Sequence, residues 1–248
     1  MKKYLFSFLS LTVLSVGVAY AAPNVFMVGD SNLNSQNQNI EIEHIKSFGL
    51  GVGQPLGDFE AVTEIADYHP GSKMLYSTNG YNSPATVDRY DLSDINNPTL
   101  IESVNVGTGG VTSVAIYGDL LAAAVPSATA TNNGYLKVYN IANDGALTLA
   151  KSLRVGVLPD MVTFSPDGNM ILTANEGQPN DAYTIDPEGS VSIVDISKGV
   201  ASATVTTANF RAFNSNPSSI RKSVPSATLA QEVEPEYIAV SADSKKAY

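Results

Sequence analysis

The chain has 248 residues, of which 44% are hydrophobic and 15% charged, so it is neither disordered nor a bundle of membrane helices. Fourteen basic residues against 24 acidic ones give a net charge of −10, which excludes the basic surface that nucleic-acid binding requires. The absence of cysteine excludes disulfides, thiolate zinc sites and iron–sulfur clusters.

Residues 1–21 are predicted to be a signal peptide. Lys2 and Lys3 precede an apolar run over residues 5–18. After this run comes a small-x-small cleavage site, Ala19-Tyr20-Ala21. A membrane span needs roughly 20 apolar residues, so we expect no transmembrane span in the mature chain, with an uncleaved anchor as the alternative. The expected location is the periplasm, cell surface or exterior of a Gram-negative-like bacterium.

A repeated strand pattern follows, after a connector or outer strand at residues 22–45. Strands are expected at 64–66, 74–76 and 87–92, then at 113–117, 120–125 and 136–141, then at 161–164, 170–174 and 191–196, with a fourth copy beginning at 237–241. The anchors Ile65, Val114 and Val162 are 49 and 48 residues apart. A period near 50 with about four short strands per unit is typical of a β-propeller blade. A β-sandwich with chance spacing is the alternative.

The predicted fold is therefore an all-β propeller of the YVTN or quinoprotein-like class over residues 46–248. Six or seven blades of ~50 residues need roughly 300 to 350 residues, and this chain supplies about three and a half. We interpret it as an N-terminal fragment of a propeller with seven blades when complete, with any anchor beyond residue 248. Val162 and Ile238 are 76 residues apart, which predicts an insertion at about 208–231. The insertion belongs either to a binding face or to an inert surface loop.

The loop at residues 175–189 of the third copy is rich in oxygen ligands. Its carboxylates are Glu176, Asp181, Asp186 and Glu188, and its carboxamides include Asn175 and Asn180. Ca²⁺ takes six to eight oxygen ligands, although the spacing is not that of an EF-hand. We interpret the four carboxylates as candidate metal ligands and the two carboxamides as candidate binding residues. The alternative is a solvated acidic loop that caps its own turns.

A second acidic group follows from propeller geometry, in which the start of each innermost strand faces the central channel. These positions are Glu64, Ser113, Asp160 and Glu236, with Glu234 just before the last. Converging carboxylates repel one another unless a cation or protons neutralise them. We therefore add Asp160 to the candidate metal ligands. Glu64, Glu234 and Glu236 are candidate binding residues. Alternatively, these side chains fan out into a water-filled channel.

These two groups are expected to share one rim. Successive strands of a blade run in opposite directions. Asp160, at the start of the innermost strand, and Glu176, just after the next strand, are therefore expected at the same end of the blade. Sites of oxygen ligands without His or Cys favour Ca²⁺ or Mg²⁺ over zinc, and the many available carbonyls favour Ca²⁺.

Enzyme signatures are mostly missing. His44 and His69 are the only histidines, and neither belongs to a His-Glu-x-x-His motif. No Gly-x-Ser-x-Gly elbow occurs, and Gly49-x-Gly51-x-Gly53 lacks the spacing of a dinucleotide loop. We expect no haem, flavin, nicotinamide or iron–sulfur cofactor.

Two stretches closely resemble the choice-of-anchor I proteins. One is Leu158-Pro159-Asp160-Met161-Val162-Thr163-Phe164-Ser165-Pro166-Asp167-Gly168, continuing through residues 174–177, 180–181 and 186–193. The other is Phe210-Arg211-Ala212-Phe213-Asn214, followed by residues 234–240. The resemblance implies a secreted bacterial propeller, similar to mesenchyme-specific cell-surface glycoproteins of animals, in a family often labelled alkaline phosphatase or phytase-like. Gln178 stands where a second acidic residue is expected, which removes a possible ligand.

The expected function is that of an exported, envelope-associated or secreted binding module with an acidic cation-binding face. Its expected partner is a cell-surface or small-molecule ligand. The alternative is a Ca²⁺-dependent phosphoester hydrolase, in which metal held by the loop at 175–189 polarises a phosphate. Such an enzyme needs a cationic partner for the phosphate, and Lys151 and Arg154 are the candidates near the loop. Whether the protein is an enzyme stays open at this point.

Overall fold

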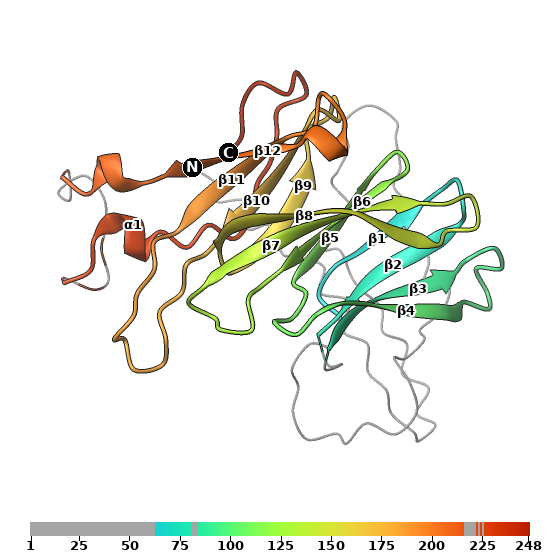
Figure 1. The fold of residues 1–248 in the computed structure, drawn as a ribbon, viewed down its shortest axis with the longest axis horizontal. Coiled ribbons are helices and arrows are strands. Elements are labelled where there is room, and N and C mark those ends of the chain that lie inside the picture. The colour runs from blue at the N-terminus through green and yellow to red at the C-terminus, as the bar shows by residue number, and fades with distance from the viewer. Residues whose placement is uncertain (1–62, 81–83, 216–221, 223, 225) are drawn as a thin grey trace, which may run out of the picture.

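The computed structural model describes residues 63–80, 84–215, 222, 224 and 226–248, which contain three consecutive four-stranded antiparallel sheets (Figure 1). The first sheet contains β1 (Ala66–His69), β2 (Met74–Asn79), β3 (Ala85–Asp91) and β4 (Thr99–Gly107). The second contains β5 (Ser113–Tyr117), β6 (Leu120–Val125), β7 (Asn133–Ile141) and β8 (Leu147–Val157). The third contains β9 (Pro159–Phe164), β10 (Met170–Asn175), β11 (Ser190–Asp195) and β12 (Thr204–Asn209).

Within every sheet the strands pair in chain order, which is the topology of a propeller blade. The innermost strands β1, β5 and β9 contact one another in sequence, so the blades follow around a common axis. The predicted all-β propeller class is confirmed. The predicted signal peptide at 1–21 and the connector at 22–45 lie outside the described residues.

The start of a further hairpin covers the open face of the third sheet. Ala239 and Tyr248 exchange two backbone hydrogen bonds of 2.9 Å, and Val240 forms a bridge with Ala247. Its turn repeats the chemistry of the turn between β9 and β10. Ser165 Oγ donates to Asp167 Oδ1 at 2.6 Å, and Ser241 Oγ donates to Asp243 Oδ1 at 2.7 Å. This repetition identifies residues 237–248 as the beginning of the next blade.

The hydrophobic core consists of layers between successive sheets. Strand β6 is buried on both faces, with Leu121 and Ala123 against the first sheet and Ala122 and Ala124 against the third. The alanines let the neighbouring sheets approach closely, and larger residues such as Tyr76 fill the space beside them. A third layer joins Leu172 and Ala174 of β10 to Ile238, and so extends the stack beyond the third sheet.

Polar contacts between blades recur at a nearly constant sequence separation. Asp67 Oδ2 accepts a hydrogen bond of 2.7 Å from Ile116 N, and Ser113 Oγ accepts one of 3.2 Å from Val162 N; both pairs are 49 residues apart. His69 is 6% exposed, and its ring contacts Ser72 Oγ at 2.8 Å and Asp119 Oδ1 at 3.2 Å. These contacts fix each innermost strand against the next one.

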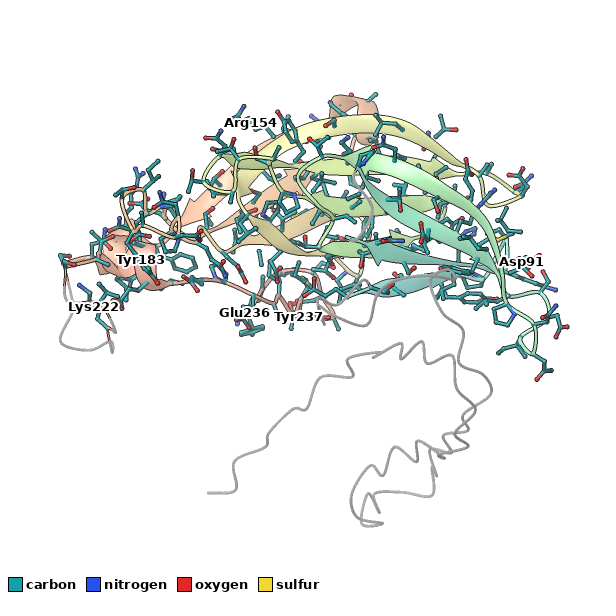
Figure 2. The ribbon with its side chains drawn as sticks, turned by 90° about the horizontal axis from the view of Figure 1, so that it is seen from below. Asp91, Arg154, Tyr183, Lys222, Glu236 and Tyr237 are labelled. Atoms are coloured by element: carbon teal, nitrogen blue, oxygen red, sulfur yellow. The ribbon has the colours of Figure 1, made fainter. Side chains whose placement is uncertain are left out.

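Figure 2 shows side chains from each blade around this frame. Within the described ranges, the one α-helix, α1 (Leu229–Glu232), has four residues, and no helix is long and apolar enough to cross a bilayer. Two 3-10 turns, η1 (Val200–Ser202) and η2 (Arg211–Phe213), flank β12. The predicted insertion at about 208–231 thus begins within the end of β12 and includes η2 and most of α1.

Replacing Asp67 with alanine removes the acceptor of the Ile116 amide. We expect the free energy of unfolding to fall by about 1 kcal/mol, because a partly buried N–H group loses its partner. Asp67→Asn keeps an acceptor oxygen and should lose clearly less. Urea unfolding followed by circular dichroism measures both variants, and equal losses would contradict the role of this contact between blades.

Candidate functional site

Five carboxylates lie at one end of the innermost strands, and we call this group the acidic face. Its members are Glu64, Asp160, Glu176, Glu234 and Glu236. They come from four separate segments: the residues before β1, the start of β9, the exit of β10 and the chain after α1. Burial raises the pKa of Asp160 and of Glu64, and a neighbouring carboxylate adds to each rise, Glu236 for Asp160 and Asp160 for Glu64.

The backbone positions Glu176 beside the entry to β9. Glu176 N donates to Leu158 O at 2.9 Å, and Gly177 N donates to Val157 O at 3.1 Å. A register shift between Ala174 and Asn175 lets the exit of β10 bend over this connection. Gly177 has a φ of 72°, a left-handed conformation that glycine adopts without steric cost. Glu176 therefore sits next to the segment that carries Asp160, as the alternation of strand direction predicts.

Glu176 is a buried residue whose side chain has no partner in the described part of the chain. The residue is 8% exposed, and its side chain makes no hydrogen bond or ion pair within the described part of the chain. Burial raises the pKa of Glu176 to about 7, and the charges of Asp160, Glu234, Glu236 and Glu64 add to that rise. A carboxyl group in this environment is stabilised by a proton or by a cation.

The other members of the acidic face are more open to solvent. Asp160 is half-buried, while Glu64, Glu234 and Glu236 are exposed. Desolvation is still the largest cause of the raised pKa of Asp160, Glu64 and Glu234, followed in each case by neighbouring carboxylates. The acidic face therefore concentrates negative charge, with one buried member, Glu176, and four members that are more open to solvent.

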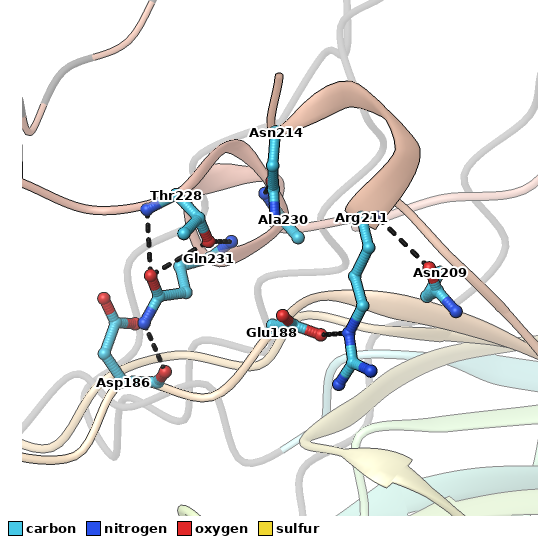
Figure 3. A network of polar contacts seen from close by, with 8 residues as sticks. All are labelled: Asp186, Glu188, Asn209, Arg211, Asn214, Thr228, Ala230 and Gln231. Carbon is cyan, nitrogen blue, oxygen red and sulfur yellow. Dashed lines mark hydrogen bonds and ion pairs between the residues drawn. The ribbon is translucent and has the colours of Figure 1, made fainter. Parts of the chain in front are cut away.

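A network of contacts docks the insertion onto the third-blade loop (Figure 3). Arg211 Nε pairs with Glu188 Oε2 at 2.6 Å, and Gln231 Nε2 donates to Asp186 O at 2.9 Å. Gly189 N donates to Ala230 O at 2.8 Å, and Ala230 N donates to Asn214 Oδ1 at 2.9 Å. These contacts fix α1, which leads directly into Glu234 and Glu236.

Helix α1 is short and depends on its cap. Thr228 Oγ1 accepts from Gln231 N at 3.3 Å, while Gln231 Oε1 accepts from Thr228 N at 2.8 Å. This capping box satisfies backbone donors that a single turn of helix leaves open. Because the same Gln231 side chain also reaches Asp186 O, the cap and the docking of the insertion are coupled.

An open groove of about 670 Å³ lies between the loop and the insertion, and we call it the loop–insertion groove. Its lining residues are Gln178, Pro179, Asn180, Asp181, Tyr183, Asp186, Val224, Ala227, Gln231, Glu232 and Glu234. Glu234 belongs both to this groove and to the acidic face, so the two features are continuous. A smaller cleft of about 260 Å³ touches the acidic face at Glu64 and is lined further by Gly109, Gly110 and Thr112.

The structure separates the five predicted metal ligands into three places. Asp160 and Glu176 lie in the acidic face, Asp181 and Asp186 line the groove, and Glu188 is engaged by Arg211. In the described ranges, no three Asp, Glu or His side chains form a ready metal site. The loop therefore does not gather its carboxylates into one coordination sphere, because Glu188 points to the insertion instead.

The predicted binding residues also divide. Glu64, Glu234 and Glu236 belong to the acidic face, and Asn180 lines the groove while its Oδ1 accepts from Thr184 N and Ile185 N at 2.9 and 3.0 Å. Asn175 is fully buried, so its amide is not available at the surface. Its Nδ2 donates to Ser190 O at 3.1 Å and to Ser192 Oγ at 3.0 Å, which ties β10 to β11.

Ser113 likewise does not face the channel. It is 1% exposed and bonds to the neighbouring innermost strand. Sequence reasoning missed Arg211, Gln231 and Gly189 as the residues that hold the insertion in place. Their roles depend on contacts with residues 23 to 45 positions away, for which the local sequence gives no signal.

Glu176→Gln is expected to change how stability depends on pH. The folded protein holds a proton on Glu176 up to about pH 7, whereas the ordinary value is 4.5. The stability that this proton contributes is present at low pH and is lost as the pH rises through about 7. Without divalent cations, the variant should melt about 2–4 °C above the parent at pH 8 and close to it at pH 4. Calorimetric melting measures this, and a parent that is the more stable protein at pH 8 would contradict it.

Gly189→Ala is expected to detach the insertion. An added Cβ would lie 1.7 Å from Val233 O, so the two backbones must separate. We expect a loss of about 2 kcal/mol in the free energy of unfolding, with faster proteolysis between residues 222 and 234. Gly80→Ala is the matched control, since nothing lies within 4 Å of its added Cβ. Unchanged proteolysis in Gly189→Ala would show that this contact does not hold the insertion.

Three solved structures are similar to the chain, and one of them reaches a TM-score of 0.50. A candidate 6-phosphogluconolactonase from Bacteroides uniformis has a TM-score of 0.50 at 13% identity, over 82% of this chain and 51% of that one. A functionally unknown protein from Desulfotomaculum acetoxidans gives 0.49 at 18%, over 82% and 51%. A second candidate 6-phosphogluconolactonase, from Bacteroides fragilis, gives 0.46 at 17%, over 58% and 37%. The chain thus spans about half or less of the length of these proteins, and the likeness concerns the fold alone.

The family of the chain follows from its sequence. No curated protein sequence matches it. The choice-of-anchor I domain, in contrast, matches residues 64–248, which include all three sheets, the acidic face and the loop–insertion groove. The chain belongs to the choice-of-anchor I family.

Proposed function

We propose that the chain is part of an exported or surface-anchored propeller module whose acidic face binds a cation, with Ca²⁺ as the first candidate. The observation that carries the proposal is the buried residue Glu176, whose side chain has no partner within the described residues and whose pKa is raised by burial and by four other carboxylates. A buried charge without a partner is costly, and a bound cation offsets that cost. The family assignment supports export or surface anchoring, and the predicted signal peptide at 1–21 agrees with it.

Ca²⁺ suits this face better than Mg²⁺ or zinc. Asp160, Glu176 and Glu236 offer carboxylate oxygens, which are the hard ligands that Ca²⁺ takes. Because three carboxylates do not converge within the described residues, water must complete the coordination shell. Ca²⁺ accepts six to eight oxygen ligands in flexible geometry, whereas Mg²⁺ requires a near-ideal octahedron.

The module is proposed to present this face to a cell-surface or small-molecule ligand. The loop–insertion groove is open and continuous with the acidic face through Glu234. Binding sites in propellers commonly use loops at one end of the blades, and both features lie in such loops. The cation would neutralise the face and hold its loops in a fixed arrangement.

A phosphoester hydrolase is less well supported. Lys151, one of its candidate cationic partners, donates to Ala201 O at 2.6 Å and to Ala203 O at 3.3 Å. Arg154 lies on the side of the molecule opposite Glu236 in Figure 2. Arg211 is paired with Glu188. None of these three cations is placed to hold a phosphate at the acidic face.

Calorimetric titration with Ca²⁺ tests the cation site. We expect saturable binding and a higher melting temperature in Ca²⁺, because a ligand that binds the folded state stabilises it. Asp160→Asn should weaken the affinity about tenfold or more, whereas Asp94→Asn, the same change of charge in an exposed turn, should not. Asp186→Asn should have little effect on Ca²⁺, because Asp186 lies in the groove. No heat and no shift in melting temperature would reject Ca²⁺ as the cation.

An aryl phosphate assay separates the two functions. A binding module should show no turnover with or without Ca²⁺. Ca²⁺-dependent turnover that Asp181→Asn abolishes would establish the hydrolase instead.

A further inference from the structure

We propose that Ser72, His69 and Asp119 form a nucleophilic site that hydrolyses small carboxylic esters. His69 is the last residue of β1, Ser72 lies in the turn between β1 and β2, and Asp119 lies in the turn between β5 and β6. Since the acidic face lies where the innermost strands begin, these turns are at the opposite end of the blades. The proposal therefore goes beyond the cation-binding function and does not depend on it.

Hydrogen bonds determine which nitrogen of the His69 ring carries the proton. Ser72 N donates to His69 Nδ1 at 3.2 Å, so Nδ1 is the nitrogen without a proton. The proton is then on Nε2, which donates to Asp119 Oδ1 at 3.2 Å. Ser72 Oγ lies 2.8 Å from Nδ1 and donates to it, because Nδ1 has no proton to give. A serine that donates to an imidazole, which in turn donates to a carboxylate, is the arrangement of a base-activated nucleophile.

Two glycines leave the space that this arrangement needs. A Cβ at Gly71 would lie 2.9 Å from Cε1 of the His69 ring, and a Cβ at Gly145 would lie 3.1 Å from Ser72 Oγ. The imidazole therefore packs closely against the turn, and His69 is buried. A ring held in one orientation by packing and by both of its nitrogens is a pre-organised general base.

The corresponding turns of the other blades contain a serine but no imidazole. Ser165 and Ser241 each donate directly to an aspartate in their own turn, at 2.6 and 2.7 Å. In the first blade, histidine ends the innermost strand, and the aspartate comes from the neighbouring blade. Because the other turns close without a histidine, closure of the turn does not account for His69.

The reacting atoms are accessible only to small substrates or small parts of substrates. Ser72 is partly exposed, and the side chain of Asp119 is 84% exposed. Neither the loop–insertion groove nor the smaller cleft includes these residues. The site thus lies at the surface, which suits a short acyl group such as acetyl rather than a substrate that needs an enclosing pocket.

The proposed reaction has two steps. In the first, Ser72 Oγ forms a bond to the acyl carbon while its proton passes to His69 Nδ1, and that proton leaves with the alcohol when the ester bond breaks. In the second, water attacks the acyl carbon and gives a proton to Nδ1, the carboxylic acid is released, and Ser72 Oγ recovers the proton. Asp119 is a positioning residue, because it keeps the proton of the imidazole on Nε2.

The first test labels the protein with a fluorophosphonate, which forms a covalent bond to base-activated serines with loss of fluoride. Peptide mass spectrometry then identifies the labelled residue. We expect label on Ser72 and none on Ser241, which is also partly exposed but has no imidazole partner. This comparison is made within one unmodified chain, so it does not depend on whether a variant folds. No label on Ser72, or equal label on Ser241, would overturn the proposal.

The second test measures the hydrolysis of p-nitrophenyl acetate. Ser72→Ala should lower kcat about a hundredfold, because general-base assistance contributes about 10²–10⁴-fold, whereas Ser241→Ala should leave kcat unchanged. Asp119→Asn should lower kcat at least about tenfold with KM unchanged, because an amide can bond to either tautomer of the ring. Melting temperatures equal to that of the parent show that these variants fold. A parent no faster than Ser72→Ala would overturn the proposal.

The two proposals fail independently. Ester hydrolysis should be the same in Ca²⁺ and in EDTA, because no residue of the acidic face takes part, and hydrolysis that requires Ca²⁺ would overturn the nucleophilic site. Labelling of Ser72 without any Ca²⁺ binding would reject the cation and leave the nucleophilic site standing. Ca²⁺ binding without labelling of Ser72 would do the reverse.

Discussion

The connection between β8 and β9 holds the acidic face together. Leu158 is the single residue between the two strands, and its φ of 48° is a left-handed conformation that costs a side-chain-bearing residue about 1–2 kcal/mol. This conformation turns the carbonyls of Val157 and Leu158 toward the exit of β10, where they accept the amides of Gly177 and Glu176. Two hydrogen bonds between segments thus offset local strain and fix a carboxylate that would otherwise turn to solvent.

The face also depends on a close approach between two backbones. Gly189 lies against Val233 O without room for a side chain, and this contact brings the residues after α1 next to the third blade. Arg211 removes Glu188 from the set of free carboxylates by pairing with it. The insertion therefore holds the segment with Glu234 and Glu236 at the face, and it withdraws Glu188 from the face.

Much of this architecture is visible in the sequence, for identifiable reasons. The two inner strands of each blade are apolar and end in strong turn residues, so their period of about 50 residues can be read directly. The proximity of Asp160 and Glu176 follows from the alternation of strand direction. The outermost strands do not stand out individually in the sequence; β12, for example, is exposed except at Val205 and lacks an apolar alternation.

The parts of the site that could not be predicted depend on tertiary partners. Asn175 is expected in the loop, yet it is the last residue of β10 and is buried, because Ser190 and Ser192 on the adjacent strand accept hydrogen bonds from its amide. Glu188 has the same local surroundings as the other loop carboxylates, and only the fold brings Arg211 to it. The sequence does not tell which carboxylate or carboxamide side chains have partners in the fold, because the same groups can accept hydrogen bonds from protein or from water.

The constant separation of the contacts between blades has a consequence for how the chain folds. Asp67 reaches Ile116, and Ser113 reaches Val162, each across 49 residues. The entropy of closing a loop depends on its length, so each blade that joins the stack meets nearly the same entropic barrier. Interactions limited to nearest neighbours favour growth of the folded structure by stepwise addition. A finished blade then acts as the template on which either neighbouring blade condenses, so folding can begin at any blade and spread along the chain.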